Sequence, residues 1–447
     1  MSVRAGDQRT TTDEVTVDSD SFRKGECPVA VYGLGKLGLP VATVFAERCG
    51  TVVGVDTDQT VVDLVGEGTV PFSHEEGLES LLGRVIDEGA FSVTSDGDSA
   101  AHSARIHVIV VPVPLNSSRR ADLSAIDEVV STIGAGLSAG DLVVIESTVP
   151  PGTCRDHVRP ALANAAALDE DKFMLASCPE RMSSGRALRD IRGAHPRIVG
   201  GVDAASTEAA ASVYQVITAN DVVPVVDART AEAVKLFEGV YRDVNIALAN
   251  ELATALDGTG IDVRDTIAAA NILSVCDIHD PGAGVGGHCI PYYPYFLMGA
   301  ATNGMPLLST ARRVNDRMPV EVVDRLERTF DERGQQLDGM SVTVLGVAYR
   351  PEIPETAATP ARPIIEALRA RGADVSIVDP VVSGSTTEWA FEPLDIDTLA
   401  EQDGIVLVTP HESFVKIDWD RLEKPIIVDT TDTVPREVAT DTIGGRP

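Results

Sequence analysis

The chain has 447 residues, enough for two or three domains with sizeable cores, and its hydrophobic fraction of 44% is ordinary for a globular protein. Its formal net charge of −31 argues against nucleic acid as a partner, because phosphates repel an acidic surface. No run approaches the roughly 20 apolar residues that span a bilayer, so we expect a cytoplasmic protein without membrane association.

Lysine is rare in this chain. Its six occurrences are Lys24, Lys36, Lys172, Lys235, Lys416 and Lys424. An acidic, lysine-poor surface is typical of proteins that work in concentrated salt, where charge repulsion is screened to within about 3 Å at 1 M. We therefore predict a halophilic protein, with an ordinary acidic cytosolic protein as the alternative.

Residues 1–24 are polar and are predicted to form a disordered acidic tail. Strand and helix patterns then alternate from residue 27 to about 200. This rhythm predicts an α/β fold with a parallel, doubly wound sheet. The expected elements are strands at Val29–Tyr32, Val52–Asp56, His107–Val111 and Leu142–Glu146, with a helix over Leu39–Arg48.

Apolar residues recur at helical spacing from about 228 to 260, which predicts one long helix that joins domains or forms a dimer seam. A second α/β block begins near residue 340. It lacks a full GxGxxG motif, so we expect a Rossmann-like domain that does not hold a dinucleotide in the usual way. Its expected elements are strands at Ser341–Leu345, Asp374–Val378, Gly404–Val408 and Pro425–Val428, and a helix over Pro360–Arg371.

The segment Gly33-Leu34-Gly35-Lys36-Leu37-Gly38 follows a predicted strand and opens a helix. Glycines permit a tight turn and close approach of a pyrophosphate, whose charge the helix N-terminus favours. Asp56 ends the next strand, where its carboxylate accepts from ribose hydroxyls and repels a 2′-phosphate. The pattern predicts NAD rather than NADP as cofactor.

Cys289 lies in the glycine-rich segment Gly284-Val285-Gly286-Gly287-His288-Cys289-Ile290-Pro291. Glycine lets the backbone approach a ligand closely, which suits a thiolate nucleophile that attacks a bound carbonyl. A buried, unreactive cysteine in a turn is the alternative. The other five cysteines form no CxxC pair or zinc-spaced cluster, so we expect reduced thiols and no metal site.

Three other residues are candidates for chemistry. Thr148 and Glu180 each follow a predicted strand, where open α/β sheets place ligands. Lys235 lies among apolar residues of the long helix, in a chain that nearly avoids lysine, and buried lysines are often tuned for chemistry. A solvated helix-face lysine is the alternative.

These motifs together resemble the UDP-glucose/UDP-N-acetylmannosamine dehydrogenase family over residues 27 to about 435. The segments that carry the likeness are GLGKLGLP (33–40), ESTVPPGT (146–153), CPER (178–181), RIVGG (197–201), KLFEGVYRDVNIALANEL (235–252), GVGGHCIP (284–291) and LGVAYRP (345–351). Three of them, around Glu180, Asn245 and Cys289, look like the branch that acts on N-acetylated sugars.

The resemblance implies two Rossmann-like domains joined by the long helix: an NAD-binding domain over 25–215, a central dimerisation domain with the cysteine loop over 216–325, and a UDP-sugar-binding domain over 326–447. The long central helix itself suggests a homodimer. The implied reaction oxidises the sugar C6 alcohol to a carboxylate with two NAD+, and Cys289 traps the aldehyde as a thiohemiacetal and then as a thioester.

The resemblance also assigns roles to individual residues. Lys235 would stabilise developing oxyanion charge, and Glu180 and Thr148 would handle the proton and the water. Cofactor contacts are expected from Gly33, Leu34, Gly35, Leu37, Gly38, Asp56, Val111, Pro112 and Thr148. Substrate contacts are expected from Glu180, Arg181, Lys235, Arg242, Asn245, His288, Tyr349 and Arg350.

Four positions depart from the family pattern. Tyr293 stands where an aspartate is usual, Gly239 replaces an asparagine, Ala357 replaces an arginine, and Val113 replaces a threonine. Part of the hydrolytic and phosphate-binding apparatus is therefore altered. This leaves open another UDP-sugar, such as UDP-N-acetylglucosamine or UDP-glucose, or a non-catalytic relative that binds NAD or a nucleotide sugar. A two-electron hydroxyacid dehydrogenase needs no thiol, so the cysteine loop argues against it.

Overall fold

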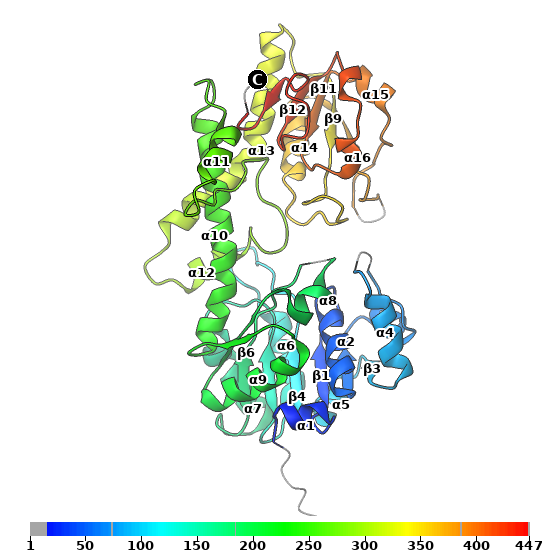
Figure 1. Ribbon diagram of the computed structural model, residues 1–447, viewed down its shortest axis with the longest axis vertical. Coiled ribbons are helices and arrows are strands. Elements are labelled where there is room, and N and C mark those ends of the chain that lie inside the picture. Colours follow the sequence, from blue (N-terminus) through cyan, green and yellow to red (C-terminus); the bar gives the residue numbers. More distant parts are fainter. Residues whose placement is uncertain (1–15, 73–74, 184, 385–386, 446–447) are drawn as a thin grey trace, which may run out of the picture. The chain divides into compact units, whose positions relative to one another are not determined.

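The computed structural model describes residues 16–72, 75–183, 185–384 and 387–445 (Figure 1). It divides into two compact units. Unit 1 comprises Met1–Asn116 and Ala121–Lys235, and unit 2 comprises Ser117–Arg120 and Leu236–Pro447. None of the helices within the described ranges is both long enough and apolar enough to cross a membrane.

Unit 1 is built on an eight-stranded sheet in the order β3-β2-β1-β4-β5-β6-β7-β8, parallel except for the β6–β7 pair. The strands are β1 (Val29–Tyr32), β2 (Val52–Val55), β3 (Phe91–Thr94), β4 (Ile106–Ile109), β5 (Leu142–Ile145), β6 (Met174–Ser177), β7 (Arg197–Gly201) and β8 (Val222–Pro224). The helices are α1 (Ser19–Arg23), α2 (Gly38–Cys49), α3 (Gln59–Gly66), α4 (Leu78–Asp87), α5 (Gly97–Ser103), α6 (Ser124–Gly136), α7 (Arg159–Ala166), α8 (Ala187–Arg189) and α9 (Ala204–Ile217). The predicted doubly wound sheet is confirmed.

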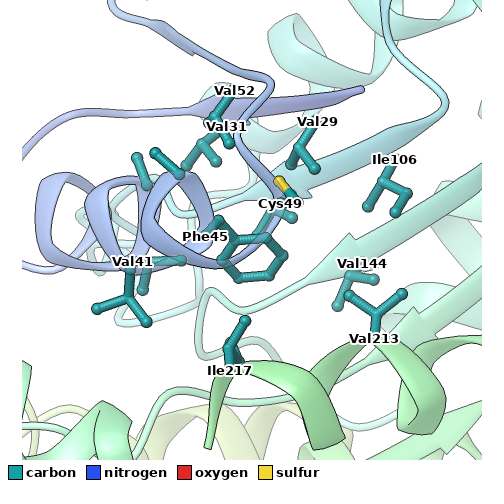
Figure 2. Close-up of a cluster of buried hydrophobic side chains, with 14 of the residues drawn as sticks. Val29, Val31, Val41, Phe45, Cys49, Val52, Ile106, Val144, Val213 and Ile217 are labelled. Carbon is teal, nitrogen blue, oxygen red and sulfur yellow. The ribbon is translucent and has the colours of Figure 1, made fainter. Parts of the chain in front are cut away.

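Strand residues of this sheet alternate between two buried faces, as the pleat requires. On one face, Val29 and Val31 of β1 pack with Phe45 of α2 and Val213 of α9 (Figure 2). On the other face, Ala30 and Tyr32 belong to a second cluster with residues of α6 and α7. Helices therefore cover both faces, which fixes the strand register that positions every loop at the sheet edge.

The predicted disordered tail is only partly within the described residues, since 1–15 lie outside them. For the remainder the prediction was wrong, because Ser19–Arg23 form helix α1, capped by the side chain of Asp18. Phe22 is fully buried and packs edge-on against Phe45 at a ring distance of 5.8 Å. One aromatic side chain among polar residues is enough to attach this segment to the core of unit 1.

Unit 2 is built on a five-stranded parallel sheet in the order β10-β9-β11-β12-β13. The strands are β9 (Ser341–Leu345), β10 (Asp374–Val378), β11 (Gly404–Leu407), β12 (Ile426–Asp429) and β13 (Asp441–Thr442). The helices are α11 (Val263–Ala270), α12 (Tyr293–Ala300), α13 (Pro306–Glu332), α14 (Ala361–Ala370), α15 (Ile396–Glu401) and α16 (Glu412–Val415). The predicted second Rossmann-like block is thus confirmed.

The predicted long helix is α10 (Ala228–Ala255), and the boundary between the units falls inside it, after Lys235. The structure has two compact units where the sequence predicts three domains, and the three-domain division stays a prediction. The first unit extends past the predicted limit at 215, because β8 belongs to its sheet. From Leu236 onward, the predicted central segment belongs to unit 2, because Ala249 and Ile267 share one core with Val322 and Val342.

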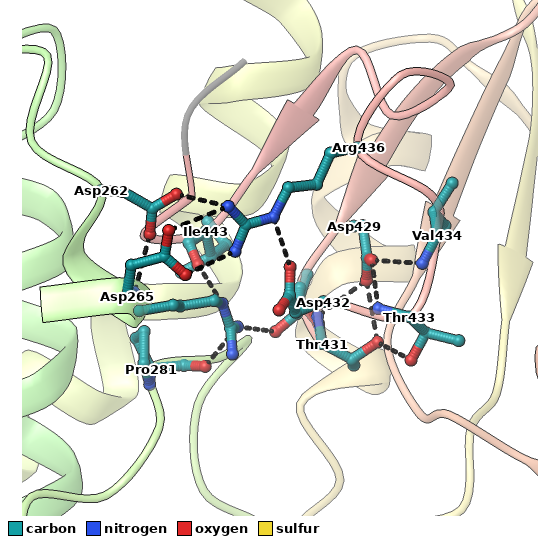
Figure 3. Close-up of polar contacts among 12 residues, drawn as sticks. Asp262, Asp265, Pro281, Asp429, Thr431, Asp432, Thr433, Val434, Arg436 and Ile443 are labelled. Carbon is teal, nitrogen blue, oxygen red and sulfur yellow. Dashed lines mark hydrogen bonds and ion pairs between the residues drawn. The ribbon is translucent and has the colours of Figure 1, made fainter. Parts of the chain in front are cut away.

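Polar contacts also join the helical part of unit 2 to its sheet (Figure 3). Arg436, which follows β12, forms ion pairs with Asp262 at 2.9 Å and Asp265 at 3.1 Å at the start of α11. The buried Arg264 donates hydrogen bonds to the carbonyls of Pro281, Thr430 and Ile443. Arg264 thus fixes the chain that leads into the cysteine loop.

Candidate active site

The turn between β1 and α2 has the geometry of a phosphate cradle. Gly33 has φ +96°, and a Cβ atom there would lie 2.4 Å from the carbonyl oxygen of Val110. A Cβ at Gly38 would lie 1.9 Å from the carbonyl oxygen of Gly33, so both positions require glycine. A Cβ at Gly35 would meet nothing within 4 Å, so this side of the turn is open. Helix α2 begins beyond Leu37, which contributes no side-chain cap.

Asp56 directly follows β2 and faces this turn. Its Oδ2 accepts a hydrogen bond from the backbone N–H of Leu34 at 2.8 Å, and its Oδ1 accepts from Asp58 at 3.0 Å. The residue is only partly buried, so its carboxylate retains lone pairs for hydroxyl donors. The cradle and the acid together fit an NAD pyrophosphate and ribose.

The equivalent acid of the second sheet is used differently. Asp379 follows β10 and is buried, and it accepts backbone hydrogen bonds from Val347, Ala348, Val381 and Val382 at 2.7–3.0 Å. Burial alone would raise the pKa of Asp379, but the hydrogen bonds from His411 and these N–H groups lower it to about 2. The lone pairs of the Asp379 carboxylate are therefore used in hydrogen bonds within the domain. Asp379 is thus engaged by the fold, whereas Asp56 keeps acceptors for hydroxyl donors.

The other predicted cofactor residues follow the neighbouring strands β4 and β5. A residue that the sequence did not single out joins the two segments. The hydroxyl of Ser147 accepts a hydrogen bond from the N–H of Val111 at 2.9 Å. The same hydroxyl donates a hydrogen bond to the carbonyl oxygen of Val111 at 2.8 Å. Ser147 thereby fixes Val111 and Pro112 beside Thr148 at the carboxyl edge of the sheet.

Glu180 and Lys235, both predicted from sequence, form an ion pair within unit 1. Lys235 Nζ lies 3.0 Å from Glu180 Oε1, and the side chains are only 12% and 6% exposed. Glu180 Oε2 accepts from the N–H of Met182 at 2.9 Å, and the N–H of Glu180 donates to the carbonyl of Glu146 at 3.1 Å. This carboxylate and ammonium are thus fixed in a largely dry environment. The nearby Arg181 donates to the carbonyl of Pro196 at 2.8 Å.

Cys289 belongs to unit 2 and is exposed. Of the other cysteines, Cys276 is partly buried and the remaining four are buried. Burial raises the pKa of Cys49 to about 11 and also raises the pKa of Cys154 and Cys178. Thiolate chemistry is therefore disfavoured at those three sites.

The glycines of the cysteine loop have a packing role that is not evident from the sequence. A Cβ at Gly286 would lie 2.8 Å from the Cβ of Tyr349, and one at Gly287 would lie 3.1 Å from the ring of Tyr349. The N–H of Gly287 donates to the carbonyl of Ala357 at 2.8 Å. The glycines let the loop lie against the segment 349–358, which follows β9.

Three of the predicted substrate residues of unit 2, namely His288, Tyr349 and Arg350, lie in this loop or in the segment that packs against it. His288 Nε2 lies 3.3 Å from Glu355 Oε2, and the His288 ring is edge-on to that of Tyr349. The guanidinium of Arg350 lies over the Tyr349 ring at 5.9 Å. Burial, together with the charges of Glu355 and Cys289, raises the pKa of Tyr349 against the opposing effect of Arg350.

Asn245 has a structural role in addition to its predicted place near the sugar. Its Oδ1 accepts from the N–H of His279 at 2.8 Å, and its Nδ2 donates to the carbonyl of Asp277 at 2.5 Å. The side-chain amide therefore fixes the chain before the cysteine loop. Arg242, on the same helix, is exposed.

Two of the departures from the family pattern contact each other. A Cβ at Gly239 would lie 2.3 Å from Cδ2 of Tyr293, whose side chain is buried. The tyrosine ring thus occupies the space that a side chain at position 239 would need. The two positions are 54 residues apart in sequence (293 minus 239), so this complementarity arises from the tertiary fold.

The comparisons with known proteins agree with this geometry. Three domain models of the UDP-glucose/GDP-mannose dehydrogenase family match the chain: the NAD-binding domain over residues 27–218, the central domain over 229–317 and the UDP-binding domain over 343–436. The chain belongs to this family.

Individual relatives cover most of the chain. An NDP-N-acetyl-D-galactosaminuronic acid dehydrogenase of Ralstonia nicotianae is 34% identical over 412 residues, which are 90% of this chain and 95% of the relative. A UDP-N-acetyl-D-mannosamine dehydrogenase of Pyrococcus horikoshii is 34% identical over 397 residues, which are 89% and 92% of the two chains. A solved structure of the UDP-D-ManNAc dehydrogenase of P. horikoshii has a TM-score of 0.87 and 31% identity, and covers 93% of this chain and 99% of that one.

Gly239→Ala tests the packing between Gly239 and Tyr293. Alanine normally stabilises a helix relative to glycine by up to about 1 kcal/mol, but overpacking a buried site costs about 1–3 kcal/mol. We expect Gly239→Ala to lower the free energy of unfolding in urea. The control is Gly83→Ala in α4, where a Cβ would meet nothing within 4 Å and should stabilise. Equal effects of the two substitutions would contradict this account.

Asp56→Asn tests the choice of cofactor. The amide oxygen retains an acceptor for the N–H of Leu34, but the charge that repels a 2′-phosphate is removed. We expect the ratio of kcat/KM for NAD+ over NADP+ to fall by about tenfold, which corresponds to about 1.4 kcal/mol. Asp58→Asn, at an exposed helix cap, should leave the ratio unchanged. Equal turnover of both cofactors by the unmodified protein would show that Asp56 does not discriminate.

Proposed function

We propose that the chain catalyses the NAD-dependent, four-electron oxidation of the C6 alcohol of a UDP-N-acetylhexosamine to a uronate, with UDP-N-acetyl-D-mannosamine as the first candidate substrate. The observation that carries the proposal is the exposed thiol of Cys289, in a loop packed against the UDP-binding domain. A two-electron dehydrogenase has no use for such a thiol. Both relatives quoted above are named for N-acetylated sugars, which favours that class over UDP-glucose.

The proposal combines the Glu180–Lys235 pair of unit 1 with Cys289 of unit 2. When bound, NAD+ would accept the hydride of each oxidation step, and in the first step the proton of the C6 hydroxyl passes to Glu180 and from there to solvent. The Cys289 thiolate adds to the aldehyde carbon, and the thiohemiacetal becomes a thioester after the second hydride leaves. Lys235 donates to the oxygen that carries negative charge. Glu180 takes a proton from water as the water attacks the thioester carbon, and the carbon–sulfur bond breaks. Thr148 helps to orient that water.

The proposed substrate contacts lie in both units. Arg181, Arg242 and Asn245 are proposed to bind near the sugar. His288, Tyr349 and Arg350 are proposed to bind on the side of the UDP-binding domain. Ala357 supplies only its backbone carbonyl to the cysteine loop, so we propose that Arg350 provides the positive charge for the diphosphate. The predicted cytoplasmic location and halophilic character stay predictions.

The stoichiometry of the Cys289→Ser variant tests this function. Purified protein, at low and at high salt, is incubated with NAD+ and a panel of UDP-sugars, and NADH formed per sugar consumed is recorded. We expect two NADH per sugar for the substrate.

Cys289→Ser should lose roughly 10³-fold or more in acid formation, because serine is a far weaker nucleophile at neutral pH. The partly buried Cys276 gives the control, Cys276→Ser, which should retain turnover. A wild-type stoichiometry in Cys289→Ser would favour a reaction without a thiol, and no turnover of any UDP-sugar would favour the non-catalytic relative.

A homodimer is part of the proposal. In unit 2, α10 exposes the apolar side chains of Phe237, Tyr241 and Leu248, and a pocket of about 670 Å³ lies between this face and residues 305–308. Monomeric proteins rarely leave such a face uncovered, and a second copy of the chain is the proposed occupant.

Phe237→Asp should therefore shift the protein from dimer to monomer in light scattering coupled to size exclusion. An isolated charge placed in an apolar interface costs several kcal/mol. Val415→Asp is the control, because Val415 is equally exposed, at 59% against 62%, but lies on α16. A monomeric unmodified protein, or a dimer that survives Phe237→Asp, would argue against this interface.

A further inference from the structure

Arg197 is a buried cation behind the proposed site that the mechanism above does not use. It begins β7 and is 2% exposed. None of its three guanidinium nitrogens has a hydrogen-bond partner among the residues that the structure describes. A buried guanidinium is costly unless opposite charge surrounds it. Arg197 is therefore held by charge and by aromatic contact.

Those contacts come from two side chains on neighbouring elements. Glu146, which directly follows β5, is fully buried, and its Oε2 lies 3.8 Å from Arg197 Nη1. Tyr214 of α9 donates its hydroxyl to Glu146 Oε1 at 2.5 Å, and its ring lies 5.7 Å below the Arg197 guanidinium. Glu146 is thus oriented by Tyr214 and paired with Arg197.

The register of the antiparallel pair β6–β7 brings this cluster to Glu180. Ser177 lies opposite Gly200, so continuing the register by three residues places Glu180 opposite Arg197. Directly opposed residues of an antiparallel pair point to the same face. Although burial opposes it, the charges of Glu146, Cys178, Tyr214 and Glu180 raise the pKa of Arg197, in agreement with this placement.

The charges then alternate from the core to the site, as Glu146, Arg197, Glu180 and Lys235. Glu180 lies between two cations and Arg197 between two carboxylates. Arg197 attracts the Glu180 carboxylate from the core side. The Lys235 ammonium therefore shares this carboxylate with the Arg197 guanidinium. This leaves Lys235 more available to an oxygen of the substrate.

We propose that Arg197 is a positioning residue that fixes the charge and orientation of Glu180 against Lys235, and that Glu146 and Tyr214 hold Arg197 in place. The inference rests on the proposed function for the role of Glu180 in the reaction. The cluster of charges itself does not depend on that role. The charged groups that act on Glu180 are Glu146, Arg197 and Lys235.

Two charge-neutralising variants give opposite expectations. Glu146→Gln removes the carboxylate that pairs with Arg197, so the Arg197 charge acts on Glu180 alone and stabilises its carboxylate more strongly. The acid limb of the pH profile of kcat should therefore move to lower pH. Arg197→Met removes that cation, so the limb should move to higher pH. Each shift should be on the order of one pH unit. A purely structural role would not produce shifts of opposite sign.

Tyrosine substitutions provide a matched control for stability. Tyr214→Phe and Tyr32→Phe each remove one hydroxyl from a buried ring of unit 1, and Tyr32 OH pairs with His107 Nδ1 at 3.2 Å. Both should lower the denaturation midpoint similarly. Only Tyr214→Phe should lower kcat, by about 10-fold, with the KM values for sugar and NAD+ little changed. Equal losses of kcat in the two variants would overturn the proposal.

A readout without turnover separates this inference from the proposed function. A double-mutant cycle of unfolding in urea, with Arg197→Met, Glu180→Gln and their combination, measures the coupling of the two charges. We expect non-additive changes in stability. Additive changes, or shifts of the pH profile with the same sign, would overturn the inference. If Arg197→Met does not fold, Arg197→Gln, which also removes the cation but keeps a polar side chain, takes its place in both tests. An inactive protein with clear coupling would refute the proposed reaction and leave the charge cluster intact.

Discussion

Parallel strand pairing is the constraint on which the rest of this structure depends. The carboxyl ends of parallel strands meet at one edge of a sheet, so residues that follow separate strands are gathered there. Gly33 follows β1, Asp56 follows β2, Thr148 follows β5 and Glu180 follows β6, although they span some 150 residues of sequence (180 minus 33). Apolar clusters on both faces of the sheet hold the strands in register. This register fixes the positions of the residues that follow the strands.

Buried charged side chains lie close to that edge of the sheet. The Glu180–Lys235 pair is largely dry, and behind it Arg197 and Glu146 are deeper still. Buried ion pairs contribute little net stability, because desolvation offsets their attraction. Their retention at the proposed site is explained by electrostatic preorganisation, since a charge fixed before reaction needs no reorganisation during it. Fold stability comes instead from the apolar clusters on both faces of the sheet.

The two Rossmann-like blocks show how one architecture supports two uses. Both sheets place an acid after a strand that neighbours the glycine turn. Asp56 has two backbone donors and is partly exposed, so it can receive a ribose. Asp379 accepts hydrogen bonds from four backbone N–H groups and lies beside His411. Its carboxylate therefore has a structural role. The number of donors around the acid, rather than the fold, separates a cofactor site from a structural one.

The sequence by itself determined the elements and the residues that follow them, because strand–turn–helix motifs such as 29–38 depend on local backbone geometry and hydrophobic period. It also identified Glu180, Lys235 and Cys289 as candidates from their residue type and surroundings. Tertiary structure alone decided that Tyr293 fills the space at Gly239, that Arg197 pairs with Glu146, and that the cysteine loop packs on Tyr349. Those relations depend on pairing between segments far apart in the chain, which no local pattern encodes.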